Sequence, residues 1–125
     1  MRGKQADLHR LFHMVEYCRK LQAVGEDAQT YENFIAEENY RLVDVSAFYI
    51  GQLGELSHGL SDEMKDRLSD IPWKQISDMS NQIIYDYENR DTKIIWGVVT
   101  EDSSALAERC LEVLRAENFD ETEIV

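Results

Sequence analysis

The chain has 125 residues, of which 25 are acidic and 13 are basic, so its formal net charge at pH 7 is −12. This length predicts one domain with its own core, and no apolar run approaches the ~18 residues that a bilayer-spanning helix needs. The acidic balance disfavours RNA or DNA as a partner, and the N-terminal sequence MRGKQADLHR lacks the apolar region of a secretory signal, so we expect a cytoplasmic protein.

The first half of the chain has the periodicity of two helices. Apolar residues recur every three or four positions over 7–24, and Gly25 is expected to end that helix. Thr30 can cap a second, long helix over 31–59, because its hydroxyl can accept a hydrogen bond from a free backbone N–H.

Small residues within these helices indicate close packing. Gly51 and Gly54 lie inside the second helix, where each costs about 1 kcal/mol relative to alanine. A neighbouring helix that approaches closely would explain them. Cys18 and Cys110 each lie among apolar residues, so we expect both to be buried thiols rather than a disulfide or a metal site.

The third quarter of the chain predicts two further helices. Ser61 can cap a short one that ends near Leu68. Asp70 can cap the next, which we expect over 73–87, with Pro72 in its first turn, where proline is tolerated.

The last quarter is helical in our interpretation. Residues 89–91 predict a turn, and the β-branched run over 92–99 fits either a strand or a short helix. We expect a helix, because no other segment offers a strand partner. Ser103 or Ser104 can cap a final helix, and the acidic tail is expected to fray.

These elements predict an all-α fold. Its simplest form is an antiparallel four-helix bundle with one or two additional short helices. We expect a single domain over 1–117 and an acidic C-terminal tail over 118–125.

The stretch over 71–96, IPWKQISDMSNQIIYDYENRDTKIIW, is the most informative part of the chain. Five of its residues recur at steps of three and four and so share one helical face: Trp73, Ile76, Ser80, Ile83 and Tyr87. This pattern places Ser80 near Tyr87, with Tyr85 to one side.

Three blocks resemble the HepT-like branch of the HEPN superfamily, also called the DUF86 family. They are YIGQLGELSHGLS at 49–61, IPWKQISDMSNQIIYDY at 71–87 and DTKIIW at 91–96. The resemblance implies a small HEPN-like helical ribonuclease without a cofactor, usually the toxin of a toxin–antitoxin pair. It further implies a homodimer with two motif helices facing across a cleft, and a minimal nucleotidyltransferase as the antitoxin partner.

The chain departs from the family at the motif that carries the chemistry. The family pattern is arginine, four spacers, histidine, one spacer and tyrosine, and these positions fall on Ser80, Tyr85 and Tyr87. Only Tyr87 matches. Asn81 and Asp86, beside the motif positions, also match the family.

This departure removes two chemical groups. Metal-independent RNA cleavage needs a group that handles the proton of the 2′-hydroxyl and a cation for the charge developing on phosphate. Serine carries no charge, and tyrosine ionises near pH 10 whereas histidine ionises near pH 6.5. Each loss typically costs at least ~10²-fold in rate, so we expect ribonuclease activity to be impaired or lost.

Several other residues have two interpretations each. Glu55 either supports the motif helix or a dimer contact, or is an exposed carboxylate. Tyr87 is either the acceptor of adenylate groups, as the resemblance implies, or a tyrosine at the edge of the core. Arg2 and His9 match the broader HEPN arginine-to-histidine spacing only in the number of residues between them. His9 and His13 have a spacing that could bind zinc, but we interpret them as surface histidines and expect no metal.

Three hypotheses follow. The first is a toxin-family protein whose nuclease site has degenerated, naturally or by engineering. The second is a non-catalytic binding module or partner subunit of a nucleotidyltransferase. The third is a ribonuclease with a rearranged site.

Overall fold

The structure, a computed structural model, describes residues 3–120, and every regular element within them is helical. Four main helices form the body: α1 (Gly3–Ala28), α3 (Tyr40–Gly59), α5 (Trp73–Tyr85) and α7 (Ser103–Ala116). Three short helices join them: α2 (Tyr31–Ile35), α4 (Asp62–Arg67) and α6 (Thr92–Gly97). The prediction of an all-α bundle of four main helices is confirmed, with three short helices added.

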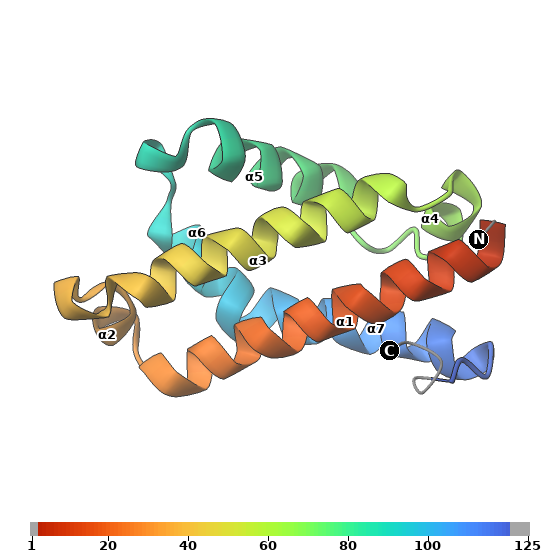
Figure 1. The fold of residues 1–125 in the computed structure, drawn as a ribbon, viewed down its shortest axis with the longest axis horizontal. Coiled ribbons are helices and arrows are strands. Elements are labelled where there is room, and N and C mark those ends of the chain that lie inside the picture. Colours follow the sequence, from red (N-terminus) through yellow and green to blue (C-terminus); the bar gives the residue numbers. More distant parts are fainter. Residues whose placement is uncertain (1–2, 121–125) are drawn as a thin grey trace.

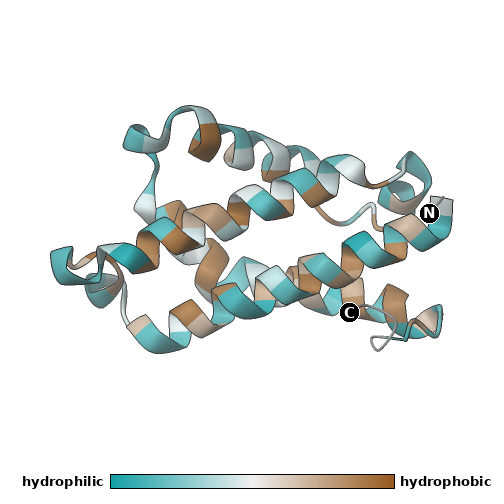
Figure 2. Cartoon of the chain, viewed as in Figure 1, coloured by the Kyte–Doolittle hydropathy of each residue, from teal (hydrophilic) through white to brown (hydrophobic). Residues whose placement is uncertain are grey.

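The main helices lie side by side and alternate in direction (Figure 1). Helix α1 packs against both α3 and α7, and α5 packs against the other side of α3. Hydrophobic and hydrophilic residues alternate along each helix (Figure 2), as amphipathic packing requires. The core is centred on fully buried α1 side chains such as Leu11, Met14 and Leu21.

Gly25 does not end the first helix, contrary to our expectation. Helix α1 continues to Ala28, and Gln29 follows in a left-handed conformation with φ of 66°. A Cβ built on Gly25 would lie 3.1 Å from Val99 Cγ1. The glycine therefore serves a close approach between α1 and a later segment of the chain.

The long helix expected over 31–59 is interrupted. Thr30 does cap α2, accepting a hydrogen bond from the Asn33 backbone N–H at 3.1 Å. The chain then becomes extended at Ala36, with ψ of 138°, and passes through a 3₁₀ turn (Glu37–Asn39) before α3. The Asn39 amide donates to the Asn33 carbonyl at 2.9 Å, which stabilises the interruption.

The two caps predicted in the third quarter have different outcomes. Ser61 caps α4, accepting from the Met64 N–H at 3.1 Å. The expectation that Asp70 caps α5 is wrong, because Pro72 occupies the cap position without a side-chain hydrogen bond. The Asp70 carboxylate instead pairs with Arg109.

The expected helix over 92–99 is confirmed, but it does not stop before the last helix. Asp91 caps α6, accepting from the Lys93 N–H at 2.9 Å. A π-helical turn (Val98–Asp102) then continues into α7. The expectation that Ser103 or Ser104 caps the last helix is wrong, because Asp102 occupies the cap position in helical geometry without a side-chain hydrogen bond. The Ser103 hydroxyl instead donates to the Val99 carbonyl at 3.2 Å.

The start of the acidic tail contacts the body of the protein. Glu117 pairs with Lys4 and Arg67, and Phe119 packs near Phe12, with 5.8 Å between ring centroids. Fraying is therefore not observed over 117–119, and residues 121–125 lie outside the described part of the chain.

Both cysteines are buried free thiols, as expected. Burial raises the pKa of Cys18, and it raises the pKa of Cys110 to about 12. Within residues 3–120, no helix combines the length and the apolarity needed to cross a membrane.

Candidate functional site

Ser80 lies inside the contact between α5 and α3. Its side chain is 2% exposed, and its hydroxyl points toward the Gly51 carbonyl, with 3.5 Å between the oxygens. A Cβ built on Gly54 would lie 1.9 Å from Ser80 Oγ. The α3 backbone thus occupies the volume that a longer side chain at position 80 would fill.

Tyr85 is the last residue of α5, and its side chain is 84% exposed. The helix ends there because Asp86 leaves helical geometry, with φ of −141° and ψ of 52°. The expected helix over 73–87 is therefore two residues too long. Tyr85 and Tyr87 lie on different elements, since Tyr87 begins the 3₁₀ turn Tyr87–Asn89.

Tyr87 forms a compact polar cluster with Asp44 of α3 and Arg90. The Tyr87 hydroxyl donates a hydrogen bond to the Asp44 carboxylate. The Arg90 guanidinium lies over the Tyr87 ring, 3.8 Å from its centroid, and donates to the same Asp44 oxygen at 3.3 Å. A second Arg90 nitrogen donates to the Tyr87 carbonyl at 2.9 Å, which fixes the turn.

The cluster controls the ionisation of the phenol. Partial burial raises the pKa of Tyr87, and the hydrogen bond to the Asp44 carboxylate raises it further, whereas the nearby Arg90 charge lowers it. The hydroxyl is therefore protonated at neutral pH. An attack by this oxygen would require a base, and the Asp44 carboxylate is already in contact with the proton.

A shallow hollow of about 390 Å³ lies beside the cluster, between α3 and α5. Nine residues line it: Asp44, Ala47, Phe48, Gly51, Gln52, Glu55, Ile83, Ile84 and Tyr87. Two of the predicted site residues, Glu55 and Tyr87, thus share one surface. Ser80 is buried and Tyr85 is exposed, and neither lines the hollow.

The two remaining motif residues lie on the surface. Asn81 is exposed on α5. Asp86 accepts a hydrogen bond from the Asn89 amide at 2.9 Å, which stabilises the turn that carries Tyr87.

The histidines have local partners. The His9 ring packs edge-on against Phe119, with 5.3 Å between centroids. His13 Nδ1 lies 2.7 Å from the Glu16 carboxylate, and His58 Nε2 lies 3.1 Å from Ser77 Oγ. No group of three potential metal ligands occurs over residues 3–120, and Arg2, which we paired with His9 by spacing, lies outside the described residues.

Sequence reasoning missed Asp44 and Arg90. Arg90 could have been found, because it follows Tyr87 by three residues, within reach of one helical turn. Asp44 lies 43 residues away, and only the packing of α3 against α5 brings it to the tyrosine. No local pattern indicates such a contact.

The chain is similar to ribonucleases of one family. The family model described as "Ribonuclease HepT-like" matches residues 14–113. No solved structure matches the chain significantly.

Three relatives illustrate the similarity. A protein of Caldanaerobacter subterraneus subsp. tengcongensis named "Putative RNase" is 26% identical over 88 residues, which is 70% of this chain and 77% of the relative. The "Probable ribonuclease HepT" of Thermococcus cleftensis is 26% identical over 76 residues, or 61% of this chain and 67% of the relative. A "Putative RNase" of Methanocaldococcus jannaschii is 28% identical over 72 residues, or 58% of this chain and 64% of the relative.

Proposed function

Because this chain belongs to the HepT-like ribonuclease family, we propose that it is the toxin-type member of a toxin–antitoxin pair whose nuclease site has degenerated. Its cleavage of RNA is impaired or lost. The observation that carries this proposal is the position of Ser80, which stands where the family has arginine. Its side chain is buried against Gly54, so the position has neither a positive charge nor room for one.

The positions of the other motif residues support the same conclusion. A general base must lie within hydrogen-bond reach of the proton it removes, in a site that holds the substrate. Tyr85 projects into solvent from the end of α5, at 84% exposure. Arg90 is a cation near Tyr87, but its guanidinium is engaged with Asp44 and the tyrosine ring.

The apolar surface beside Tyr87 supports a homodimer as part of this proposal. Phe48 and Ile84 are 57% and 47% exposed and line the hollow, and Tyr85, which follows Ile84 in the chain, is exposed. Large exposed apolar side chains that gather in one place mark protein contacts more often than single ones do. A second copy covering this surface would bring two α5 helices to one interface.

Expression in a bacterial host tests the degeneration of the nuclease. We expect induced expression of the native chain to leave growth unaffected, while an active HepT-like ribonuclease with its arginine and histidine in place arrests growth. Growth arrest by the native chain that Tyr85→Phe relieves would contradict the proposal, because Tyr85 would then be a working catalytic group.

The alternative function, a partner subunit of a minimal nucleotidyltransferase, is favoured by the Tyr87 cluster. Tyr87 is 39% exposed, and its hydroxyl already donates to the Asp44 carboxylate. In adenylate transfer the Tyr87 oxygen would bond to the α-phosphorus of ATP and pyrophosphate would leave. Asp44 would take the phenolic proton.

Mass spectrometry tests this alternative. Incubation with the nucleotidyltransferase, ATP and Mg²⁺ should add adenylate to the native chain, much less to Asp44→Asn and none to Tyr87→Phe. Asn33, whose amide holds the loop after α1, offers a remote control as Asn33→Ser. Undiminished adenylation of Tyr87→Phe would exclude this acceptor.

A further inference from the structure

A second concave surface lies between the first halves of α5 and α7, and its volume is about 530 Å³. It forms because α5 packs on α3 and α7 packs on α1, so that α5 and α7 do not close against each other. Ile50 and Leu53 of α3 contribute to its lining. Ser80, Tyr85 and Tyr87 do not line it, so it is separate from the candidate site.

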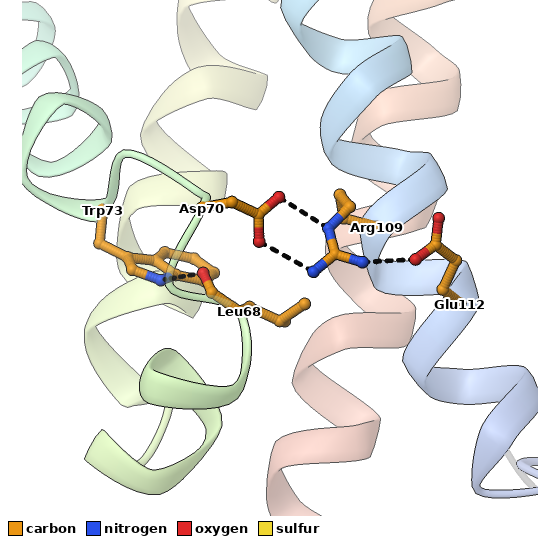
Figure 3. A network of polar contacts seen from close by, with 5 residues as sticks. All are labelled: Leu68, Asp70, Trp73, Arg109 and Glu112. Atoms are coloured by element: carbon orange, nitrogen blue, oxygen red, sulfur yellow. Dashed lines mark hydrogen bonds and ion pairs between the residues drawn. The ribbon is translucent and has the colours of Figure 1, made fainter.

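One end of this groove is held by an ion pair (Figure 3). The Arg109 guanidinium donates two hydrogen bonds of 2.8 Å to the Asp70 carboxylate and a third to Glu112. Trp73 Nε1 donates to the Leu68 carbonyl at 3.1 Å, which fixes the loop that carries Asp70. A bidentate pair of this kind sets a defined geometry between α7 and the start of α5.

The walls of the groove are apolar and partly open to solvent. Ile76 and Met79 of α5 and Leu106 of α7 all line it, and all three are half-buried. Ile94 of α6 also contributes to the lining and is 52% exposed. Removing such a surface from water favours association with an apolar partner surface.

The rim of the groove is acidic. Its ionisable residues are Asp70, Asp78, Asp102 and Arg109. The Arg109 charge is matched by Asp70 and Glu112, and the Asp78 carboxylate pairs with Lys74 at 3.0 Å. Four carboxylates (Asp70, Asp78, Asp102 and Glu112) against two cations (Lys74 and Arg109) leave the rim with a net charge of −2.

From this combination we propose that the groove binds an amphipathic helix of a partner protein. The helix presents apolar side chains at i, i+3 or i+4, and i+7 to the apolar walls of the groove. It presents lysine or arginine to the acidic rim. It packs alongside α5 and α7 as an additional helix of the bundle. This proposal goes beyond the chemistry at Tyr87 and does not depend on it.

Two other occupants match the groove less well. A second copy of the chain is assigned above to the apolar surface beside Tyr87, and the residues after Asp120, which read ETEIV, would bring negative charge to a negative rim. Like charges across an interface suppress association, whereas opposite charges favour it. A basic amphipathic helix is the occupant that matches both the apolar walls and the acidic rim.

Selection from a displayed library of helical peptides tests the proposal, with the full chain as bait. The counter-bait is Met79→Ser combined with Leu106→Ser, whose folding is checked by circular dichroism. We expect enriched peptides to be basic with an apolar stripe, and fluorescence anisotropy to give at least a tenfold weaker affinity for the counter-bait. The matched control is Ile35→Ser, an exposed apolar residue of α2, which should bind like the native chain.

The rim is tested separately by Asp78→Lys combined with Asp102→Lys, at two exposed positions. We expect at least a fivefold loss of affinity for the selected peptides, with a smaller loss at high salt. Three results would overturn the proposal. They are no enrichment over the counter-bait, peptides that bind only after removal of residues 121–125, and a change in oligomeric state in the groove variant, which would assign the groove to a second copy.

Discussion

Ser80 of α5 packs closely against Gly54 of α3. The Ser80 side chain fits because position 54 has no Cβ. The sequence indicated close packing at Gly54 but not its partner, since nothing in a helical period identifies which residue of a second helix faces a glycine.

Substitution of Gly54 tests this contact. We expect Gly54→Ala to lower the free energy of unfolding by about 1–3 kcal/mol, as overpacking does. Gly97→Ala is the matched control, because a Cβ there meets nothing within 4 Å and alanine favours a helix by up to about 1 kcal/mol. Urea denaturation measures both, and equal effects at the two glycines would show that the α3–α5 contact is not tight.

Tyr87 makes the stability of the protein sensitive to alkaline pH. Its pKa is higher in the folded protein than in the unfolded chain, through burial and the Asp44 hydrogen bond. The resulting stabilisation is present below pH ~10, the ordinary tyrosine value, and is lost as the pH rises through the folded pKa. The titration of Tyr87 is obtained as the difference between the spectrophotometric titration curves of the native chain and of Tyr87→Phe. We expect its midpoint above pH ~10, and we expect Asp44→Asn to lower that midpoint. A midpoint at or below pH ~10 in the native chain would contradict the cluster.

Helix ends show which elements local sequence determines. Thr30 and Ser61 were identified correctly, because a cap satisfies backbone donors within three residues of itself. Asp70 and Ser103 are also residue types that commonly cap helices. The Asp70 carboxylate pairs with Arg109 instead, and the Ser103 hydroxyl donates to a carbonyl within a continuous helix. A distant ion-pair partner and a π-helical turn determine these two helix starts, and the pattern of capping residues indicates neither of them.

At the junction between α1 and α4, Ser61, which caps α4, is also hydrogen-bonded to Asp7 of α1. The buried Asp7 carboxylate accepts from the Ser61 backbone N–H at 2.9 Å and from its hydroxyl at 2.5 Å. Asp7→Ala leaves these donors unsatisfied, so we expect a loss of about 1–3 kcal/mol in the free energy of unfolding. Asp27→Ala, at an exposed position of the same helix, should change it by less than about 0.5 kcal/mol, and a loss as small for Asp7→Ala would show that the junction is not formed.

At the scale of the whole molecule, the fold class followed from the helical periods and the single proline. The arrangement did not, because amphipathic stripes show that helices pack but not which pairs do. The central position of α1 and the open groove between α5 and α7 come from contacts between distant segments. The same contacts place the three motif positions in different environments. Ser80 is buried, Tyr85 is exposed, and Tyr87 is hydrogen-bonded to Asp44.

The most direct test of the proposed loss of nuclease activity is the rate of metal-free RNA cleavage. The native chain and an active HepT-like ribonuclease would be compared on the same single-stranded and structured RNAs in the presence of a chelator. We expect the native chain to be at least ~10²-fold slower, because a preorganised cation and an acid–base group are missing. Cleavage within tenfold of the active enzyme, abolished by Tyr85→Phe, would contradict it.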